Sequence, residues 1–413
     1  MQKSIKLNTK KKILNDPVYG FINIPGGLLF ELIEHPYFQR LRRIKQLGLT
    51  YLVFPGAVHT RFQHAIGCMH LINLAIDVLR SKGQNITEEE ANASRIAILL
   101  HDIGHGPFSH ALESCIIPNL PHEELSLMFM QELNNQYNGK LELAIKIFQG
   151  EYHKKFLHQL VSGQLDMDRL DYLRRDSFFT GVTEGVVGSE RIIKMLQVVD
   201  DNLVVEAKGI YSVEKFLIAR RLMYWQVYLH KTVLVGELQL INFLKRLKHL
   251  YQNNKITIDN KYLKFFLDDK NNKNNKEILD NFSMLDDFDF VYLVKQLLNH
   301  EDRIISYLAN SLMNRKFPKI IIGKDPIPEN YIKELKIKTC KEFNLSPEEI
   351  GYYVFSGEVS NNTYSMDDER INIQYGNKLI DIAEASDMLN ISVLSKVVKK
   401  YYVCVPKIIL NKY

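Results

Sequence analysis

The sequence predicts a mainly α-helical protein, with a helical catalytic region followed by a smaller α+β region. Two observations carry this prediction. A helical pattern of apolar residues dominates from His35 onward, whereas runs rich in β-branched and aromatic residues alternate with helical stretches near the end of the chain. The 413 residues are 46% hydrophobic and 24% charged, which is typical of a globular protein that can bury a sizeable core. We therefore expect an extended N-terminal segment (1–30), a helical domain (31–240) and an α+β region (241–413).

The helical domain is predicted from capping signals and apolar spacing. Pro36 suits a first helical turn, and Gly48 suits a helix stop. Residues 202–212 are expected to form a small β excursion, followed by one long helix from Val213 to about Leu250. The other expected helices lie at about 36–47, 60–80, 88–101, 123–135, 141–149, 153–162, 168–177 and 189–198.

The last third of the chain changes character. A low-complexity stretch at 268–277 is expected to be a flexible surface loop. Strands are expected at 317–322, 350–355, 370–375 and 401–406, alternating with helices.

The cysteines and the N-terminal residues indicate the cellular compartment in which the protein is expected. Cys68, Cys115, Cys340 and Cys404 form no CxxC pair and no disulfide framework, which favours free thiols in a reducing cytoplasm. The basic N-terminus lacks the apolar segment of a signal peptide, and no apolar run approaches the roughly 18 residues of a membrane span. The net charge of +5 suits a protein that handles anions, but it is too small to indicate nucleic-acid binding by itself.

A metal site is indicated by LLHDIGHGPFSH (99–110). His101 and Asp102 end an apolar helix, and together they offer an imidazole and a carboxylate to one divalent cation. A single His-Asp dipeptide is common and means little. Three histidines and an aspartate within ten residues, beside glycines at a packed helix end, are costly to bury unless they have a use.

Two further segments supply partners for this pair. RFQH (61–64) opens a helix with Arg61 and His64 on one face, and DMDRLDYLRRD (166–176) is acidic at its start. Alone, each segment would be read as a solvated helix face. They gain weight only as partners of the His-Asp pair.

These separated motifs, in this order, resemble those of the HD-domain metal-dependent phosphohydrolases. RFQH, HDIGHGPFSH, the pair His122-Glu123 and DMDRLDYLRRD look like those of the deoxynucleoside triphosphate triphosphohydrolases, including the mammalian member that also carries a sterile-alpha motif. The resemblance covers roughly residues 12–235 and implies release of a deoxynucleoside and tripolyphosphate. It implies four metal ligands: His64, His101, Asp102 and Asp168.

The resemblance also implies roles near the phosphates and the sugar. His105, His122 and Glu113 match residues beside the scissile phosphate, and histidine suits proton transfer near neutral pH. The expected helix over 213–231 would place Arg220, Tyr224, Tyr228 and Lys231 on one face, although a solvated amphipathic face is about as plausible from spacing alone. Tyr224 stands where the mammalian enzyme has His, and Arg169 where it has Lys. The residues that match substrate contacts are Gln46, Leu47, Arg61, His110, Arg169, Tyr172, Asp176, Arg220, Tyr224 and Tyr228.

A regulatory site is a further implication of the resemblance. Five residues are similar to those that bind an activating guanine nucleotide between subunits, which would make the protein a homo-oligomer. A basic helix face packed in an oligomer accounts for them equally well. They are Lys12, Asn15, Glu34, Gln39 and Arg42, with Glu34 in place of Asp.

Three functions remain open at this point. The first is hydrolysis of deoxynucleoside triphosphates, with dGTP preference or guanine-nucleotide activation as variants. The second is the same metal chemistry on another nucleotide or phosphoester, and the third is a nucleic-acid-binding or scaffold protein with a vestigial site. One divalent metal ion is expected, and mixed nitrogen and oxygen ligands suit Mn, Mg, Fe, Zn or Ni.

Overall fold

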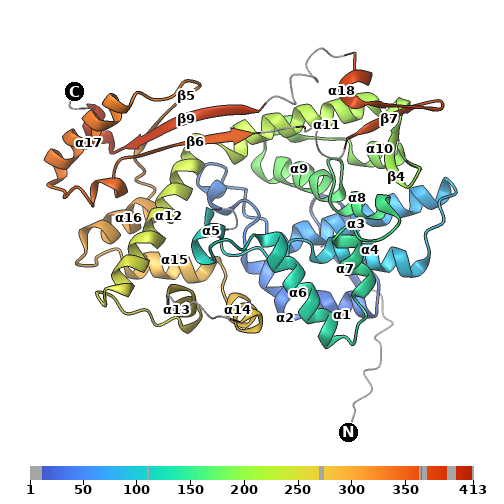
Figure 1. Ribbon diagram of the computed structural model, residues 1–413, viewed down its shortest axis with the longest axis horizontal. Helices are drawn as coiled ribbons and strands as arrows, with labels where there is room; N and C mark the ends of the chain where they lie inside the picture. The colour runs from blue at the N-terminus through green and yellow to red at the C-terminus, as the bar shows by residue number, and fades with distance from the viewer. Residues whose placement is uncertain are drawn as a thin grey trace, which may run out of the picture.

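The structure is a computed structural model that describes residues 12–108, 111–268, 274–361, 364, 370–387 and 397–411. It is mainly helical, as predicted, with small sheets (Figure 1). The described part of the chain starts with an antiparallel hairpin of β1 (Lys12–Asp16) and β2 (Gly20–Ile24). The helix α1 (Leu28–Glu34) follows it.

The helix predicted over 36–47 is shorter than expected. It consists of α2 (Pro36–Gln39) and a 3₁₀ turn (Arg40–Arg43), and Ile44 is extended. Lys45 then forms a β-bridge with Thr60, and the Gln46 amide donates to the His59 carbonyl at 3.0 Å. This pairing draws the chain out of the helix and into the 3₁₀ turn Gly48–Leu52.

Six helices build the centre of the catalytic region: α3 (Arg61–Ser81), α4 (Glu88–Leu100), α6 (His122–Gln136), α7 (Glu142–Phe148), α8 (Lys155–Val161) and α9 (Met167–Thr180). The short α5 (Glu113–Ile116) precedes α6. Helix α3 packs against both α4 and α9. An 18-residue window of α3 has a mean hydropathy of 1.3, enough for a membrane span by composition, but 67% of it is buried inside the protein. The apolar character of α3 therefore reflects its central position.

The segment after α9 differs from the prediction in two places. The helix expected at 189–198 is α10 (Ser189–Lys194), and β3 (Leu196–Val199) follows because it pairs with β4 (Asn202–Glu206). The single helix expected over 213–250 is wrong. It is split into α11 (Ile210–Met223), a π-helical turn (Tyr224–Tyr228) and α12 (Lys231–Gln252). The split arises because Leu229 N bonds back to Tyr224 O at 2.7 Å, and the His230 side chain caps α12 by accepting from Thr232 N.

The C-terminal region contains helices and two sheets. Its helices are α13 (Lys261–Leu267), α14 (Asn275–Phe282), α15 (Asp287–Gln296), α16 (Arg303–Met313), α17 (Glu329–Phe343), α18 (Ile382–Ala385) and α20 (Lys407–Asn411). The strands β5 (Lys319–Gly323), β9 (Val398–Val405) and β6 (Phe355–Asn361) form one antiparallel sheet. The strands β7 (Asn372–Tyr375) and β8 (Lys378–Asp381) extend the β3–β4 sheet, with β7 parallel to β4.

The structure differs from the prediction at two places in this region. The strand expected at 350–355 is largely a turn, because the amides of Tyr353 and Val354 bond back to Ile350 O at 3.0 and 2.9 Å. Helix α14 begins within the stretch expected to be a loop, because Asn274 and Glu277 form a capping box. Residues 269–273 of that loop lie outside the described residues.

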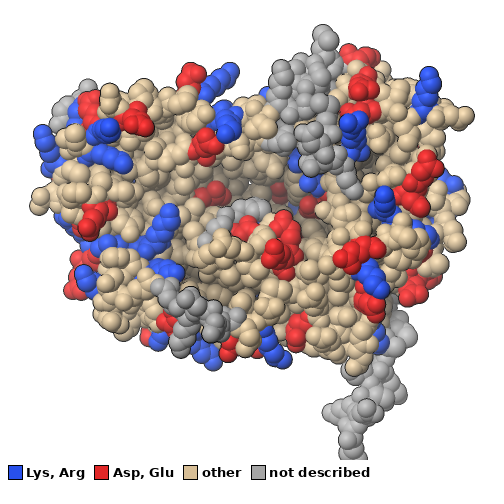
Figure 2. All heavy atoms as spheres, viewed as in Figure 1, with Lys and Arg blue, Asp and Glu red and all other residues tan. Residues whose placement is uncertain are grey.

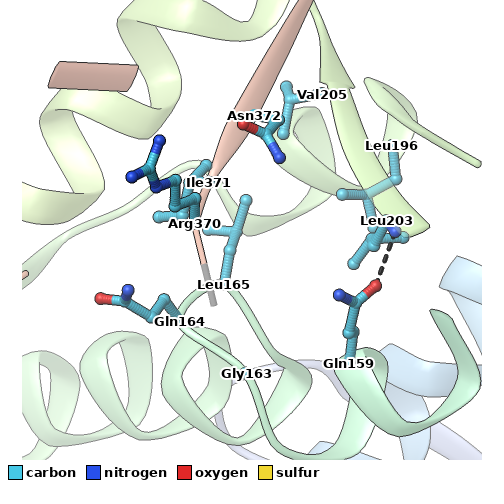
Figure 3. Close-up of a pocket in the computed structure, with 10 residues that line it drawn as sticks. All are labelled: Gln159, Gly163, Gln164, Leu165, Leu196, Leu203, Val205, Arg370, Ile371 and Asn372. Atoms are coloured by element: carbon cyan, nitrogen blue, oxygen red, sulfur yellow. Dashed lines mark hydrogen bonds between the residues drawn. The ribbon is translucent and has the colours of Figure 1, made fainter. Parts of the chain in front are cut away.

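The sheet shared by β4 and β7 packs closely on the catalytic region (Figure 3). The pocket between them has a volume of about 30 Å³ and is lined by Leu165, Leu203 and Ile371 among others. Gln159 of α8 accepts a hydrogen bond from Leu203 N at 2.7 Å there. A space of this size holds about one water molecule, so the two regions are in near-direct contact.

Arg40 joins the two regions at a second place. Its side chain is 1% exposed, and the guanidinium donates to Ile103 O at 2.8 Å and to Leu285 O at 3.3 Å. It also lies over the rings of Phe129 and Phe282. Arg40 thus ties the loop after α4 to the turn between α14 and α15.

Replacing Arg40 with alanine should destabilise the protein, because two buried carbonyl groups would lose their donor. We expect Arg40→Ala to lower the free energy of unfolding by about 2–4 kcal/mol, measured by urea denaturation. Arg42→Ala is the control. Its exposed guanidinium stacks on Phe62, a contact worth about 1 kcal/mol or less. Equal stability losses in the two variants would show that the buried junction contributes little.

Candidate functional site

The four expected metal ligands converge between α3, the end of α4 and α9. His64 Nε2 lies 3.0 Å from Asp168 Oδ1 and 3.7 Å from Asp102 Oδ2. His101 Nε2 lies 3.3 Å from Asp102 Oδ1 and 3.5 Å from Asp168 Oδ1. Ligands about 2.0–2.2 Å from one ion are separated from one another by about 3–3.5 Å. The spacing therefore fits a single cation among the four side chains.

The hydrogen bonds of the two histidines support this arrangement. His101 Nδ1 lies 2.6 Å from Ile98 O, and His64 Nδ1 lies 2.7 Å from Asp171 Oδ2. A carbonyl or carboxylate oxygen only accepts, so each Nδ1 carries the proton and each Nε2 presents a lone pair to the cluster. Buried His101 Nε2 has no hydrogen-bond partner among the described residues. Lone pairs facing carboxylates need a positive centre between them, and the donor set is one that divalent cations accept.

The electrostatics agree with an ionised carboxylate. Burial opposes ionisation of Asp168, but its close contacts with the His101 and His64 rings outweigh burial and lower its pKa. Cys68, which the sequence analysis did not assign to the site, lies beside these groups, with Sγ 3.5 Å from His64 Nδ1.

A chain of buried ion pairs supports His64 on the Nδ1 side of its ring. Asp171 accepts from His64 and from Arg175, whose guanidinium also donates to Asp16 Oδ2 at 2.8 Å. Asp171 and Arg175 are both 0% exposed. They fit between α3 and α9 because residue 67 is glycine, and any Cβ there would collide with both side chains. The chain leads from the metal ligand to Asp16 at the end of β1.

A second histidine pair lies beside the cluster. The rings of His105 and His122 stack with centroids 3.9 Å apart. Glu113 accepts from the backbone N–H and from Nδ1 of His122, both at 2.7 Å. Gly104 permits this packing, because a Cβ there would collide with the His122 carbonyl at the start of α6. Burial and then the Arg61 charge hold the pKa of His105 well below its ordinary value. The His105 ring is therefore neutral near pH 7.

A cavity of about 460 Å³ opens beside these groups. Figure 2 shows that this face of the molecule is hollowed near its middle. Many of the expected residues line the cavity: Gln46, Leu47, Arg61, Asp102, His105, His122, Asp168, Tyr172, Asp176, Tyr224 and Tyr228. Arg61 is hydrogen-bonded to Asp102 at its edge. The remaining lining residues are Gly48, Thr50, Phe108, Leu229 and Glu237.

Asp176 is fixed by two neighbours. It accepts from Tyr228 OH at 2.8 Å and from His59 Nε2 at 2.7 Å, and the His59 ring stacks on Phe179. Sequence reasoning missed His59, because its partner lies 117 positions away. The only sequence signal was its nearness to RFQH.

Other expected residues lie apart from the cavity lining. The Arg169 guanidinium is bonded to Asp166 and Gly163 O, and Arg220 is 8% exposed on α11. Lys231 is exposed, so the continuous face expected for 220–231 is wrong, and the π turn is the reason. His110 lies outside the described residues.

The residues expected to bind a regulatory nucleotide lie near the hairpin. Arg42 Nε donates to Gln39 Oε1 at 2.8 Å. Burial lowers the pKa of Arg42, and the negative charge of Glu34 partly opposes this shift. Lys12 lies over the Phe30 ring, and Asn15 stands opposite Phe21 in the hairpin. Nucleotide activation and oligomer assembly remain predictions.

The C-terminal region also contributes to the site through Asp287, at the start of α15. Asp287 is 0% exposed and accepts from Lys45 N at 3.0 Å and from Phe108 N at 2.8 Å. These amides belong to the two loops that carry Gln46 and His105. One buried carboxylate thus holds both loops at the cavity.

Weakening the support of His64 should weaken metal binding. We expect Asp171→Asn to reduce divalent-metal affinity about 10- to 100-fold, because the partner that fixes the ring and raises its basicity is changed. Mn²⁺ titration by calorimetry measures this effect. The matched control is Glu190→Gln on α10, an exposed glutamate. Unchanged affinity in Asp171→Asn would contradict the orienting role.

Comparison with known proteins places the chain in a family. The HD domain matches residues 61–175 and the HD associated region matches residues 187–260. The YwfO protein of Bacillus subtilis is 32% identical over 315 residues, which are 75% of this chain and 71% of that protein. The human deoxynucleoside triphosphate triphosphohydrolase SAMHD1 is 33% identical over 264 residues, 53% of this chain but 42% of the human protein.

Solved structures extend the likeness to nearly the whole chain. The crystal structure of a phosphohydrolase from Bacteroides thetaiotaomicron is 54% identical with a TM-score of 0.92, covering 96% of this chain and 100% of that one. A hypothetical protein from Aquifex aeolicus is 29% identical with a TM-score of 0.73, covering 98% of each chain. HD domains bind a divalent metal, which agrees with the cluster of His64, His101, Asp102 and Asp168. The chain belongs to the HD-domain phosphohydrolase family.

Proposed function

We propose that this protein hydrolyses deoxynucleoside triphosphates to a deoxynucleoside and tripolyphosphate. One observation carries the proposal: a single cavity joins the metal cluster and the His105–His122 pair to the paired Asp176 and Tyr228. The first set of groups suits phosphate chemistry and the second suits a sugar hydroxyl. The human and Dictyostelium relatives that carry this activity in their names support it.

His64, His101, Asp102 and Asp168 would hold the metal. A divalent ion bound there supplies Lewis-acid polarisation of a phosphoryl oxygen and makes an attacking water more acidic. Arg61 lines the same end of the cavity, and its guanidinium, which is bonded to Asp102, would attract a phosphate through its positive charge.

We assign proton transfer to the stacked pair of His105 and His122. His105 Nε2 lies 3.4 Å from Asp102 Oδ1, so its ring stands at the edge of the metal cluster and on the cavity wall. His122 stacks on it, and Glu113 fixes the His122 ring through Nδ1. This geometry supports His105 as the group that exchanges a proton with the reacting phosphate, with His122 and Glu113 orienting it.

We assign sugar binding to Asp176 and its neighbours in the same cavity. Asp176 is 1% exposed, and its two oxygens are already oriented by His59 and Tyr228. Gln46 Oε1 is buried and has no partner among the described residues, which leaves an acceptor for a ligand hydroxyl. The Tyr172 and Tyr228 rings, with centroids 6.1 Å apart, would pack against one face of the sugar and leave little room for a 2′-hydroxyl.

The direct test is incubation of the purified protein with Mn²⁺ and each dNTP, with chromatographic separation of the products. The proposal expects deoxynucleoside and tripolyphosphate, and a kcat/KM for dGTP well above that for GTP. Release of orthophosphate or pyrophosphate would indicate attack at another phosphorus. Equal rates for dGTP and GTP would favour another phosphoester as the substrate.

Removing the proposed proton-transfer group should abolish most turnover. We expect His105→Ala to lower kcat by about 10²- to 10⁴-fold, the usual contribution of positioned proton transfer. The Mn²⁺ content should be unchanged, because His105 is not among the four ligands. His249→Ala on the exposed end of α12 is the control. A kcat within threefold of the parent would exclude this role for His105.

The sugar pocket makes a separate prediction. Tyr228→Ala should narrow the ratio of kcat/KM between dGTP and GTP, because it opens the floor beneath the sugar. Asp176→Ala should depress turnover of all dNTPs together, since a lost hydroxyl partner strands buried polar groups. Steady-state kinetics with dGTP and GTP on both variants measure the two effects. An unchanged dGTP/GTP ratio in Tyr228→Ala would contradict the steric account.

A further inference from the structure

The cavity contains a carboxylate that the proposed mechanism does not use. Glu237 lies in the second turn of α12 and lines the cavity with its side chain half-buried. No hydrogen bond or ion pair joins it to any other residue in the part of the chain that the structure describes. Burial alone raises its pKa to about 7, with no neighbouring charge contributing to the shift. A carboxylate in this setting lacks the partner that would offset its loss of water.

Glu237 lies on a different wall from the metal cluster. A Cβ on the adjacent Gly236 would be 3.4 Å from Leu49, so this part of α12 packs on the 3₁₀ turn Gly48–Leu52. In Figure 1, α12 lies in the left half of the molecule, whereas α3, α4 and α9 lie to the right. With phosphate chemistry at the cluster and the sugar at Asp176, this wall is left for the base.

The lining of the cavity and the Glu237 carboxylate together suit a flat ligand that carries hydrogen-bond donors. Phe108, Leu47 and Leu229 supply apolar lining to the same cavity. Glu237 adds two acceptor oxygens to this lining. The cation that lines this cavity in the described residues, Arg61, is bonded to Asp102. A ligand edge that satisfies Glu237 must therefore bring hydrogen-bond donors of its own.

Among nucleobases, guanine matches this requirement best. Its N1–H and N2–H₂ groups lie side by side and can donate in parallel to the two oxygens of one carboxylate. The corresponding edges of adenine and cytosine pair a donor with an acceptor, and thymine offers one donor between two carbonyl groups. An acceptor set against an acceptor is repulsive, so the carboxylate would select against these bases.

We propose that Glu237 is a specificity-determining residue that accepts two hydrogen bonds from the guanine edge of the substrate. This inference rests on the proposed function, because it assumes that a nucleotide occupies the cavity. The donation of two N–H groups would stabilise the ionised carboxylate that burial disfavours.

The test is Glu237→Gln, which keeps the size of the side chain but replaces one acceptor oxygen with a donor amide. We expect kcat/KM for dGTP to fall about 10- to 100-fold, the usual range for losing a bidentate contact to a base. The values for dATP, dCTP and dTTP should stay level or rise, because the amide removes an acceptor that repels the acceptor groups of these bases. Glu301→Gln, an exposed glutamate outside the cavity, is the matched control and should leave all four values unchanged.

A binding measurement separates this inference from the proposed function. Calorimetry with the α,β-imido analogues of dGTP and dATP in the presence of Mn²⁺ reports base selection without turnover. Preference of the parent for the guanine analogue, lost in Glu237→Gln, supports the role of Glu237 even if no dNTP is hydrolysed. Turnover of dNTPs with the same base profile in parent and variant overturns the role and leaves the function intact. Failure to bind either analogue overturns both.

Discussion

The buried pair of Asp171 and Arg175 is the interaction on which the site depends. It lies between α3 and α9, the helices that supply His64 and Asp168, and it sets how closely they approach. Gly67 is required for that approach, since no side chain fits there. Losing one partner of such a pair leaves an uncompensated buried charge, which costs about 3–5 kcal/mol. The pair also fixes the His64 tautomer, so one interaction stabilises the fold and orients a ligand.

The region after α12 supports the site from the other side. Arg40 connects the loop after α4 to Leu285 O, and Asp287 accepts from the amides of Lys45 and Phe108. The loops that carry Gln46 and His105 therefore take their positions from residues more than 170 positions further along the chain. The parallel pairing of β4 with β7 adds a third connection. The catalytic region and the C-terminal region share one framework.

Much of this arrangement could be predicted from the sequence, and the reasons for the failures are physical. The ligand motifs lie on helices whose apolar spacing and N-terminal caps are local signals, so the bounds predicted for α3, α4 and α9 are close to those observed. Ile44 leaves its helix because Lys45 pairs with Thr60, which no local pattern encodes. The roles of His59 and Asp287 depend on partners distant in the chain. Nothing in their own sequence neighbourhood signals such contacts.

The π turn at Tyr224–Tyr228 makes the lining of the cavity depend on the number of residues in this segment. A π turn holds one residue more than an α turn, and here it delivers Tyr224 and Tyr228 to the cavity before His230 starts the next helix. Loss of a single residue within it would restore α-helical winding and rotate the downstream residues by about 100°. A relative could thus change the shape of this cavity through a one-residue deletion, with every metal ligand untouched. Insertions and deletions in this short segment are where divergence in selectivity should be sought.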